Sequence, residues 1–184
     1  MCKMRYETQR LVLKALRPQD AELALQYYQR NKDFLAKWEP VREDAFYTLE
    51  HQRELIEHEQ ADLESGRMLR LWLFKQGEES RTIGMVGFTN IVRGAFLSCF
   101  LGYKLDGAET GKGYMTEALQ KGVSIMFEDY GLHRIEANIM PKNRASLRVV
   151  ERLGFEKEGI SRAYLRINGV WEDHAHMVLL NDNV

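Results

Sequence analysis

Three apolar stretches of strand length follow one another between residues 69 and 105, and they constrain the fold more than any other feature of the chain. They span Leu69–Lys75, Thr82–Thr89 and Leu97–Leu105, and the turn-forming segments GEES and VRG separate them. Apolar runs of this length between turn signals are typical of an antiparallel meander. We therefore expect these strands to form the middle of a sheet.

Helices and further strands are predicted on both sides of this meander. Asn168-Gly169 is a strong hairpin signal between the last two strands. The segment 34–47, FLAKWEPVREDAFY, has no clean period and is expected to be a loop. Strands are expected over Leu11–Leu16, His133–Met140, Tyr164–Ile167 and Trp171–Leu180, and helices after Pro18, over Leu49–Glu64, after Gly113 and over Asn143–Leu153. This order indicates a mixed α/β sheet with helices on its faces.

Length and charge set limits on the class of protein. A chain of 184 residues suits a single domain spanning 1–184. Lys+Arg 26 against Asp+Glu 27 leaves a formal charge of −1, which argues against strong nonspecific binding to nucleic acid or to a membrane. The two cysteines, Cys2 and Cys99, are too few for a disulfide framework or a CxxC metal site, so no metal is expected. The chain shows no signal core or membrane span, so we expect a cytoplasmic protein.

Residues 108–119, AETGKGYMTEAL, are the main candidate for binding an anion. Gly111 and Gly113 let backbone N–H groups approach a ligand, and the helix that follows directs its positive end toward it. A Walker A loop is excluded, because Asp106 stands at its first glycine and Gly113 at its final hydroxyl. The dinucleotide fingerprint fails at Thr116. On the residues alone, the segment is either an anion site or a plain strand-to-helix turn.

A second segment, HRIEANIMPKNRASLRVVERLGFEKEG at 133–159, removes that ambiguity. Together the two segments resemble the GNAT superfamily of acyl-CoA-dependent N-acetyltransferases. Its Q/R-x-x-G-x-G/A loop grips the pyrophosphate of coenzyme A and corresponds to TGKGYM at 110–115, although Thr110 and Met115 depart from the pattern. Its N-x-x-[AS]…GF segment lines the pantetheine arm and corresponds to NRAS at 143–146 with GF at 154–155.

The likeness is closer to the RimJ-like ribosomal-protein-alanine N-acetyltransferases, and it covers nearly the whole chain in order. The matching pieces are RLVLK at 10–14, FLAKWEPVRE at 34–43, NIVRG at 90–94, LGYKL at 101–105, GKGYMTEAL at 111–119, HRIEAN at 133–138, RLGFEKEG at 152–159 and INGVWEDH at 167–174. The resemblance implies the GNAT fold, a central mixed twisted sheet of about seven strands flanked by about four helices.

The resemblance also implies which residues bind acetyl-CoA, the expected co-substrate. The backbone of Tyr103, Lys104 and Leu105 would pair with the pantetheine amide like an added strand. The pyrophosphate would lie against Gly111, Lys112, Gly113, Tyr114, Met115 and Thr116. Lys112 is either a charge partner for a phosphate or a solvated loop residue. Arg144 or Arg148 would bind the 3′-phosphate, and Asn143 would bind the pantetheine arm, cap the following helix, or do both.

Ser146 is the main candidate for the catalytic acid. Attack of an amine on a thioester releases a thiolate, which benefits from a nearby proton donor. Many GNAT enzymes use a tyrosine seven residues after the motif's asparagine, and this chain has Val150 there. Similar enzymes carry a serine at the position of Ser146, and that serine is thought to be the acid.

The catalytic base is less well defined by the sequence. A glutamate often stands on the strand before the loop in this family, and here Cys99 or Phe100 takes its place. The remaining candidates are Glu39, Glu136, Asp173 and His174, of which Glu39 in the WEP segment is the first choice. Trp38, Glu39 and Asp173 are also expected to contact or orient the acceptor.

These features predict an N-α-acetyltransferase that acts on the N-terminus of a protein, expected to be ribosomal, by direct attack in a ternary complex. An α-amino group needs only ~1 kcal/mol to be neutral at pH 7, whereas a lysine needs ~4.6 kcal/mol, so a site without a strand carboxylate suits N-termini better. The alternatives are an acetyltransferase for a polyamine or aminoglycoside, and a non-catalytic protein that binds acetyl-CoA or assembling ribosomes. We expect a monomer or a homodimer, with ribosome association possible.

Overall fold

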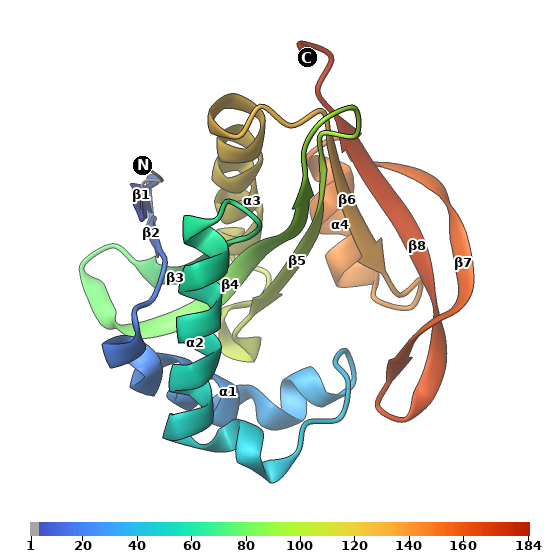
Figure 1. The fold of residues 1–184 in the computed structure, drawn as a ribbon. Helices are drawn as coiled ribbons and strands as arrows, with labels where there is room; N and C mark the ends of the chain where they lie inside the picture. The colour runs from blue at the N-terminus through green and yellow to red at the C-terminus, as the bar shows by residue number, and fades with distance from the viewer. Residues whose placement is uncertain (1–3) are drawn as a thin grey trace.

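The computed structural model describes residues 4–184 and contains one eight-stranded mixed sheet with the order β1-β2-β3-β4-β5-β6-β8-β7 (Figure 1). The strands are β1 (Arg5–Glu7), β2 (Leu11–Lys14), β3 (Leu69–Lys75), β4 (Glu78–Val92), β5 (Ser98–Leu105), β6 (Arg134–Ile139), β7 (Glu156–Ile167) and β8 (Val170–Leu180). Neighbouring strands are antiparallel except β5 and β6, which are parallel. The expected mixed α/β class and the central meander β3-β4-β5 are confirmed.

Four α-helices cover the two faces of this sheet. They are α1 (Ala21–Ala36), α2 (Leu49–Glu64), α3 (Tyr114–Ser124) and α4 (Arg144–Arg152), and a π-helical turn, Ile125–Asp129, continues α3. Helices α1 and α2 lie on one face, and α3 and α4 on the other (Figure 1). Within residues 4–184, none of these helices has the length and apolar composition needed to cross a membrane.

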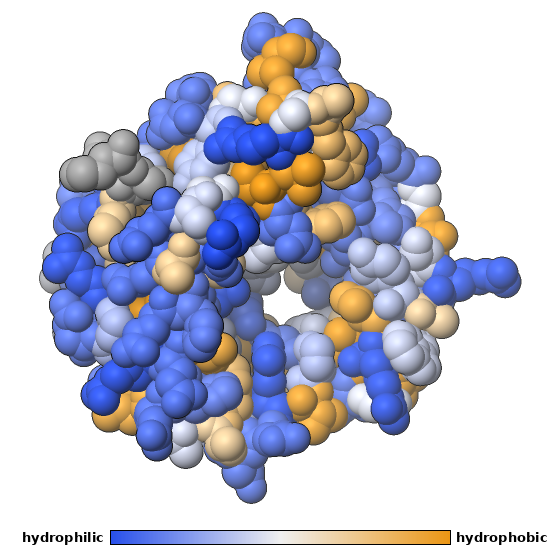
Figure 2. Space-filling model, in the orientation of Figure 1, coloured by the Kyte–Doolittle hydropathy of each residue, from blue (hydrophilic) through white to orange (hydrophobic). Residues whose placement is uncertain are grey.

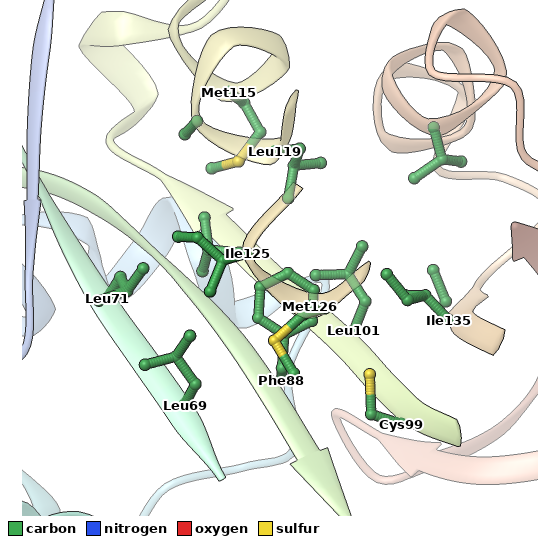
Figure 3. Close-up of a cluster of buried hydrophobic side chains, with 14 of the residues drawn as sticks. Leu69, Leu71, Phe88, Cys99, Leu101, Met115, Leu119, Ile125, Met126 and Ile135 are labelled. Carbon is green, nitrogen blue, oxygen red and sulfur yellow. The ribbon is translucent and has the colours of Figure 1, made fainter. Parts of the chain in front are cut away.

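The alternation of side chains along β3 explains why both faces carry a core. Leu69, Leu71 and Leu73 pack against the side of α3, whereas Trp72 and Phe74 pack against the side of α1. Figure 3 shows Phe88 of β4 amid the first cluster. A strand that is buried on both faces has a nearly continuous apolar sequence, as LRLWLFK of β3 does.

The parallel strands β5 and β6 share only a short ladder. Their pairs are Ser98 with Arg134, Cys99 with Ile135, and Phe100 with Glu136. Beyond Phe100, β5 pairs only with β4, and β6 turns away to pair only with β8. The two strands diverge from this short ladder, as Figure 1 shows.

Three strands differ most from those expected. β7 begins at Glu156 rather than at Tyr164, β4 spans Glu78–Val92 rather than Thr82–Thr89 and so includes part of the expected GEES turn, and β1 is an additional short strand. Most of β7 is exposed, so its first half, EKEGISRA, carries no apolar alternation that would mark it as a strand. Its pairing with β8, interrupted by two register shifts, is what makes it a strand.

A buried carboxylate anchors the end of β5. Asp106 accepts hydrogen bonds from Arg30 Nε and Arg81 Nη2, both 2.8 Å long. Burial by itself would raise the pKa of Asp106, but these two hydrogen bonds outweigh it and hold the pKa at about 2. Asp106 Oδ1 also accepts from Ala108 N at 3.0 Å, so the same side chain sets the turn that leaves the strand.

We expect Asp106→Asn to lower the free energy of unfolding by about 2 kcal/mol at pH 7, because two arginines lose their anionic partner. A carboxylate whose folded pKa is depressed stabilises the protein above its unfolded pKa, and that contribution is lost as the pH falls through the folded value. Urea unfolding should therefore show that the difference in unfolding free energy between the wild type and Asp106→Asn shrinks from about pH 4 toward pH 2.

Asp62→Asn provides the matched control, since Asp62 forms an exposed pair with Arg67 at 2.7 Å. This substitution should lower the free energy of unfolding by less than about 1 kcal/mol. If the loss of unfolding free energy in Asp106→Asn stayed constant down to pH 2, Asp106 would not be the stabilising carboxylate with a depressed pKa.

Candidate active site

A cavity of about 690 Å³ opens where β5 and β6 part. Its wall comes from β5, the loop that follows it, the start of α4, and the segment after α1. Figure 2 shows a deep opening near the middle of the molecular face. The predicted site residues that line the cavity are Trp38, Glu39, Tyr103, Lys104, Leu105, Gly111, Gly113, Met115, Thr116, Asn143, Ser146 and Arg148. The cavity therefore joins the glycine loop (residues 110–116) to Ser146 and to the WEP segment (residues 38–40).

The glycine loop has the backbone conformation that an anion site requires. Gly111 and Gly113 have φ of +77° and +81°, in the left-handed region that favours glycine. A Cβ at Gly111 would meet nothing within 4 Å, so the backbone there is open to a ligand. Gly113 is the N-cap of α3, and the free N–H groups of the first helical turn therefore border the cavity.

Arg10 and Glu117 hold this loop from outside the cavity. Arg10 Nε donates to Glu117 Oε2 at 2.7 Å, and Arg10 Nη1 donates to the carbonyl of Lys112 at 2.9 Å. Glu117 also accepts from Thr8 Oγ1 at 2.6 Å. Burial alone would raise the pKa of Glu117, but these hydrogen bonds lower it, so the anchor stays charged.

Two predicted loop residues point elsewhere. Lys112 Nζ donates to Ala108 O at 2.8 Å and pairs with Glu109 at 2.9 Å, and Lys112 is absent from the cavity lining. The ring of Tyr114 lies under the guanidinium of Arg10, 4.7 Å from ring centroid to Cζ, and it too lies outside the lining. Both side chains brace the loop rather than border the cavity.

The start of α4 brings Asn143, Ser146 and Tyr103 together. Asn143 is the N-cap, and its Oδ1 accepts from Ser146 N at 3.2 Å. Ser146 Oγ donates to the hydroxyl of Tyr103 at 2.7 Å, and that hydroxyl donates to the carbonyl of Ser146 at 2.9 Å. Burial raises the pKa of Tyr103, so its hydroxyl stays protonated.

The Tyr103 hydroxyl was not anticipated from the sequence. The family's usual tyrosine position is Val150, which is fully buried in the core, and β5 instead supplies a phenol to the neighbourhood of Ser146. Tyr103 and Ser146 are 43 positions apart in the chain, so no local sequence pattern could have connected them.

The arginines of α4 differ in their access to the cavity. Arg148 and Arg152 line it, whereas Arg144, at the first position of the helix, does not. All three are exposed. Of the two predicted phosphate ligands, Arg148 therefore has the more suitable place.

On the acceptor side, the WEP segment is bound to β5 and to the last hairpin. The carboxylate of Glu39 pairs with Lys104 and, at 3.6 Å, with Arg42, while its carbonyl accepts from Asn168 N at 3.3 Å. Asp173 is exposed and lies outside the lining, where its Oδ1 accepts from Ala163 N at 2.8 Å.

Comparison with known proteins identifies the family. The Acetyltransferase (GNAT) domain matches residues 10–156, which is most of the chain. The chain belongs to the GNAT acetyltransferase family. It is 43% identical over 171 residues to the probable N-acetyltransferase YjcK of Bacillus subtilis, covering 93% of this chain and 94% of that protein. It is 38% identical over 172 residues to the [ribosomal protein uS5]-alanine N-acetyltransferase of Escherichia coli, covering 94% and 88%.

Solved structures agree with the sequence relatives. The ribosomal-protein-S5-alanine acetyltransferase of Vibrio fischeri superposes with a TM-score of 0.93 and 34% identity, covering 98% of each chain. RimJ of Mycobacterium smegmatis, solved in complex with a coenzyme A disulfide, has a TM-score of 0.88 and 28% identity, covering 95% of this chain and 83% of that one. The fold and the enzyme class of this GNAT acetyltransferase are therefore established.

The cysteine of β5 in this GNAT acetyltransferase is a core residue. Cys99 is buried, and burial raises the pKa of its thiol to about 12. A thiol of this kind is a poor nucleophile, because the thiolate is the reactive form. Among residues 4–184, no group of three His, Cys, Asp or Glu side chains is arranged to hold a metal ion.

The cavity of this GNAT acetyltransferase is also lined by residues to which the sequence assigned no part. They are Phe34, Leu35, Lys37, Leu101, Gly102, Asn138, Ile139, Met140, Ala145, Val149 and Arg152; Thr110 of the TGKGYM segment and His174, one of the base candidates, line it as well. Asn138 and His174 stand on β6 and β8, on the same face of the sheet as Glu136 and His176. Alternate polar residues in an otherwise apolar strand are the sequence signal that could have marked Asn138.

Asn143→Ala should lower the free energy of unfolding by ~1 kcal/mol, because α4 loses its N-cap acceptor. Asn143→Asp keeps an acceptor at the same place and should stay close to the wild type. Thermal or urea unfolding distinguishes the two variants, and equal destabilisation by both would contradict the capping role.

Proposed function

We propose that this protein is an N-α-acetyltransferase that transfers the acetyl group of acetyl-CoA to the N-terminal amino group of a protein, and of a ribosomal protein in particular. The observation that carries the proposal is the continuous cavity from the glycine-lined start of α3 to Ser146 and the WEP segment. The named activity of the S5-alanine and uS5-alanine acetyltransferases, at 34% and 38% identity, supports the choice of acceptor.

The residues present suit coenzyme A. Gly111 leaves room for a phosphate beside the N-terminus of α3, where Gly113 is the N-cap. The unpaired side of β5 from Leu101 to Leu105 offers backbone groups to an extended amide chain, in the manner of strand addition. The coenzyme A disulfide in the structure of Mycobacterium smegmatis RimJ supports coenzyme A as the ligand.

The reaction proposed is direct transfer within a ternary complex. The acceptor nitrogen forms a bond to the thioester carbon, the carbon–sulfur bond breaks, and the sulfur leaves with its electron pair. In the resting site the 2.7 Å hydrogen bond to Tyr103 holds Ser146 Oγ in place. Ser146 then turns its hydroxyl hydrogen from Tyr103 to the departing sulfur, gives it the proton, and regains one from solvent. The burial of Cys99 argues against a covalent acetyl-enzyme at that thiol.

Specificity for N-termini follows from the cost of deprotonation. The carboxylate of Glu39 is paired with Lys104 and Arg42, so it adds little free negative charge to attract polyamines. A neutral α-amino group costs ~1 kcal/mol at pH 7, against ~4.6 kcal/mol for lysine. We therefore place small polycationic amines and internal lysines second to protein N-termini.

The decisive experiment measures thiol release from acetyl-CoA across a panel of acceptors. The panel contains peptides with free N-terminal Ala or Ser, N-terminally blocked peptides with a lysine, and small amines such as spermidine and an aminoglycoside. We expect release only with free N-terminal peptides. Release with small amines alone would favour the small-molecule activity, and no release with any amine would favour a binding protein.

Ser146→Ala should lower kcat by about a hundredfold, because a positioned acid contributes ~10²–10⁴. Tyr103→Phe should lower kcat roughly tenfold, since one hydrogen bond of ~1.4 kcal/mol to Ser146 is lost. Stopped-flow thiol release measures both. The same kcat for Ser146→Ala as for the wild type would exclude serine as the acid.

Arg148→Ala should weaken coenzyme A binding about tenfold through loss of a charge-assisted phosphate contact, and should leave dephospho-coenzyme A binding nearly unchanged. Calorimetric titration with both ligands makes the comparison. Arg144→Ala, one helical turn away and outside the cavity lining, is the matched control. An Arg144/Arg148 double alanine variant that still distinguishes the two ligands like the wild type would refute the phosphate role.

A further inference from the structure

The carboxylates on the acceptor side of the cavity are already engaged. Glu39 pairs with Lys104 and Arg42. Asp173 is exposed, and its Oδ1 accepts from the backbone N–H of Ala163, a residue held at φ +48°. The carboxylate of Glu39 is thus already held by two cations, and that of Asp173 holds a bulge of β7 outside the cavity lining, so neither is directed at an incoming amine.

Glu136 is engaged as well. It pairs with Arg134 at 2.9 Å and accepts from His176 Nδ1 at 2.7 Å. Burial by itself would raise the pKa of Glu136, but the hydrogen bonds from His176 and Arg134 outweigh it and lower the pKa. Its basicity is therefore reduced, and Glu136 also lies outside the cavity lining.

His176 has no free ring nitrogen. Nδ1 donates to Glu136, since an ionised carboxylate only accepts, and Nε2 lies 2.6 Å from Ser161 Oγ, which donates to it. The chain Ser161–His176–Glu136 is thus internally satisfied. Its role in the neutral state is to order this face of β6, β7 and β8.

His174 differs from His176 in one respect that matters for catalysis. Its Nδ1 lies 3.0 Å from the carbonyl of Glu172, and because a carbonyl can only accept, Nδ1 carries the hydrogen. The neutral ring therefore has its lone pair on Nε2, and Nε2 forms no hydrogen bond with any of residues 4–184. The side chain is 4% exposed and lines the cavity.

The position of His174 in the sheet places it opposite the acid. Ala175, its neighbour, packs in the core on the side of α3 and α4, so His174 belongs to the other face, toward α1 and α2. Ser146 enters the cavity from α4. The two groups thus flank the gap between β5 and β6 from opposite faces of the sheet, as an attacking amine and a leaving sulfur require.

We propose that His174 is the catalytic base, and that Nε2 accepts the proton which the acceptor ammonium loses before it attacks the thioester. The inference rests on the proposed acetyl transfer and assigns its missing base. The ammonium gives one proton to Nε2, the imidazolium releases it to solvent, and the neutral amine attacks. The nitrogen gives its second proton to solvent as the carbon–sulfur bond breaks, and Nδ1 keeps its hydrogen bond to Glu172 throughout. The ring of Tyr164, with its centroid 5.4 Å from that of His174, holds the imidazole in place.

The test variant is His174→Asn, because its amide can keep the donor toward the Glu172 carbonyl while removing the basic nitrogen. We expect kcat for the acceptor peptide to fall about a hundredfold at pH 7, with coenzyme A affinity unchanged. The loss should shrink between pH 6 and pH 9, because a larger fraction of the amine then arrives neutral. Tyr164 on β7 contacts the imidazole, and Glu172 and His176 stand two positions away on β8. The other titratable and charged groups that line the same cavity are Tyr103, Lys104, Lys37, Glu39, Arg148 and Arg152.

His133→Asn is the matched control. His133 Nδ1 lies 3.0 Å from the carbonyl of Asn181, so the same substitution alters the same kind of contact at a residue outside the cavity lining. It should leave kcat and its pH profile unchanged. His174→Ala provides a second measurement, since added imidazole should restore part of its activity by filling the vacated space.

The outcomes separate this inference from the function on which it rests. Thiol release by the wild type but none by His174→Asn at pH 7, with recovery at high pH or on addition of imidazole to His174→Ala, supports the base. If the wild type is active and the kcat of His174→Asn at pH 7 is within about twofold of the wild-type value, His174 is not the base. An equal loss at every pH with no imidazole rescue also overturns it. A wild type that is inert with every amine refutes the proposed function instead.

Discussion

Strands β5 and β6 share only three pairs of residues, and the backbone groups beyond Phe100 must find partners elsewhere. Parallel strands normally continue side by side, because an unpaired N–H or C=O away from water is costly. Here β6 is drawn away by its long antiparallel ladder with β8, while β5 stays with β4. The cavity, the access to both faces of the sheet and the free strand edge all follow from this separation.

Polar contacts hold the open end of β5 in place. Asp106 ties the end of the strand to Arg30 of α1 and Arg81 of β4, and the Tyr103 hydroxyl ties its middle to Ser146 of α4. Arg30 and Ser146, the helical partners in these contacts, belong to helices on opposite faces of the sheet. The shape of the cavity thus depends on buried hydrogen bonds as much as on apolar packing, and it should be sensitive to their loss.

Pairing of charges decides which acceptor-side groups remain available for chemistry. The carboxylates of Glu39 and Glu136 each meet two basic side chains, and Asp173 holds a bulge in β7. Glu39 and His174 both border the cavity, but the oxygens of Glu39 form ion pairs, whereas Nε2 of His174 forms no hydrogen bond with any of residues 4–184. The proposed acid, Ser146, and the proposed base, His174, then approach the cavity from opposite faces, which suits the direction of acyl transfer.

The sequence by itself determined the meander, the glycine loop before α3, the N-cap at Asn143 and the family, because each is a local pattern of apolar runs, turn formers or short motifs. It did not reveal the start of β7, whose exposed residues form a strand only by pairing with β8. Nor did it separate Arg148 from Arg144, which share a helix and a spacing but differ in access to the cavity. The contact of Tyr103 with Ser146 and the free Nε2 of His174 were decided by tertiary structure alone, because hydrogen bonds between distant segments depend on which partners the fold brings within reach.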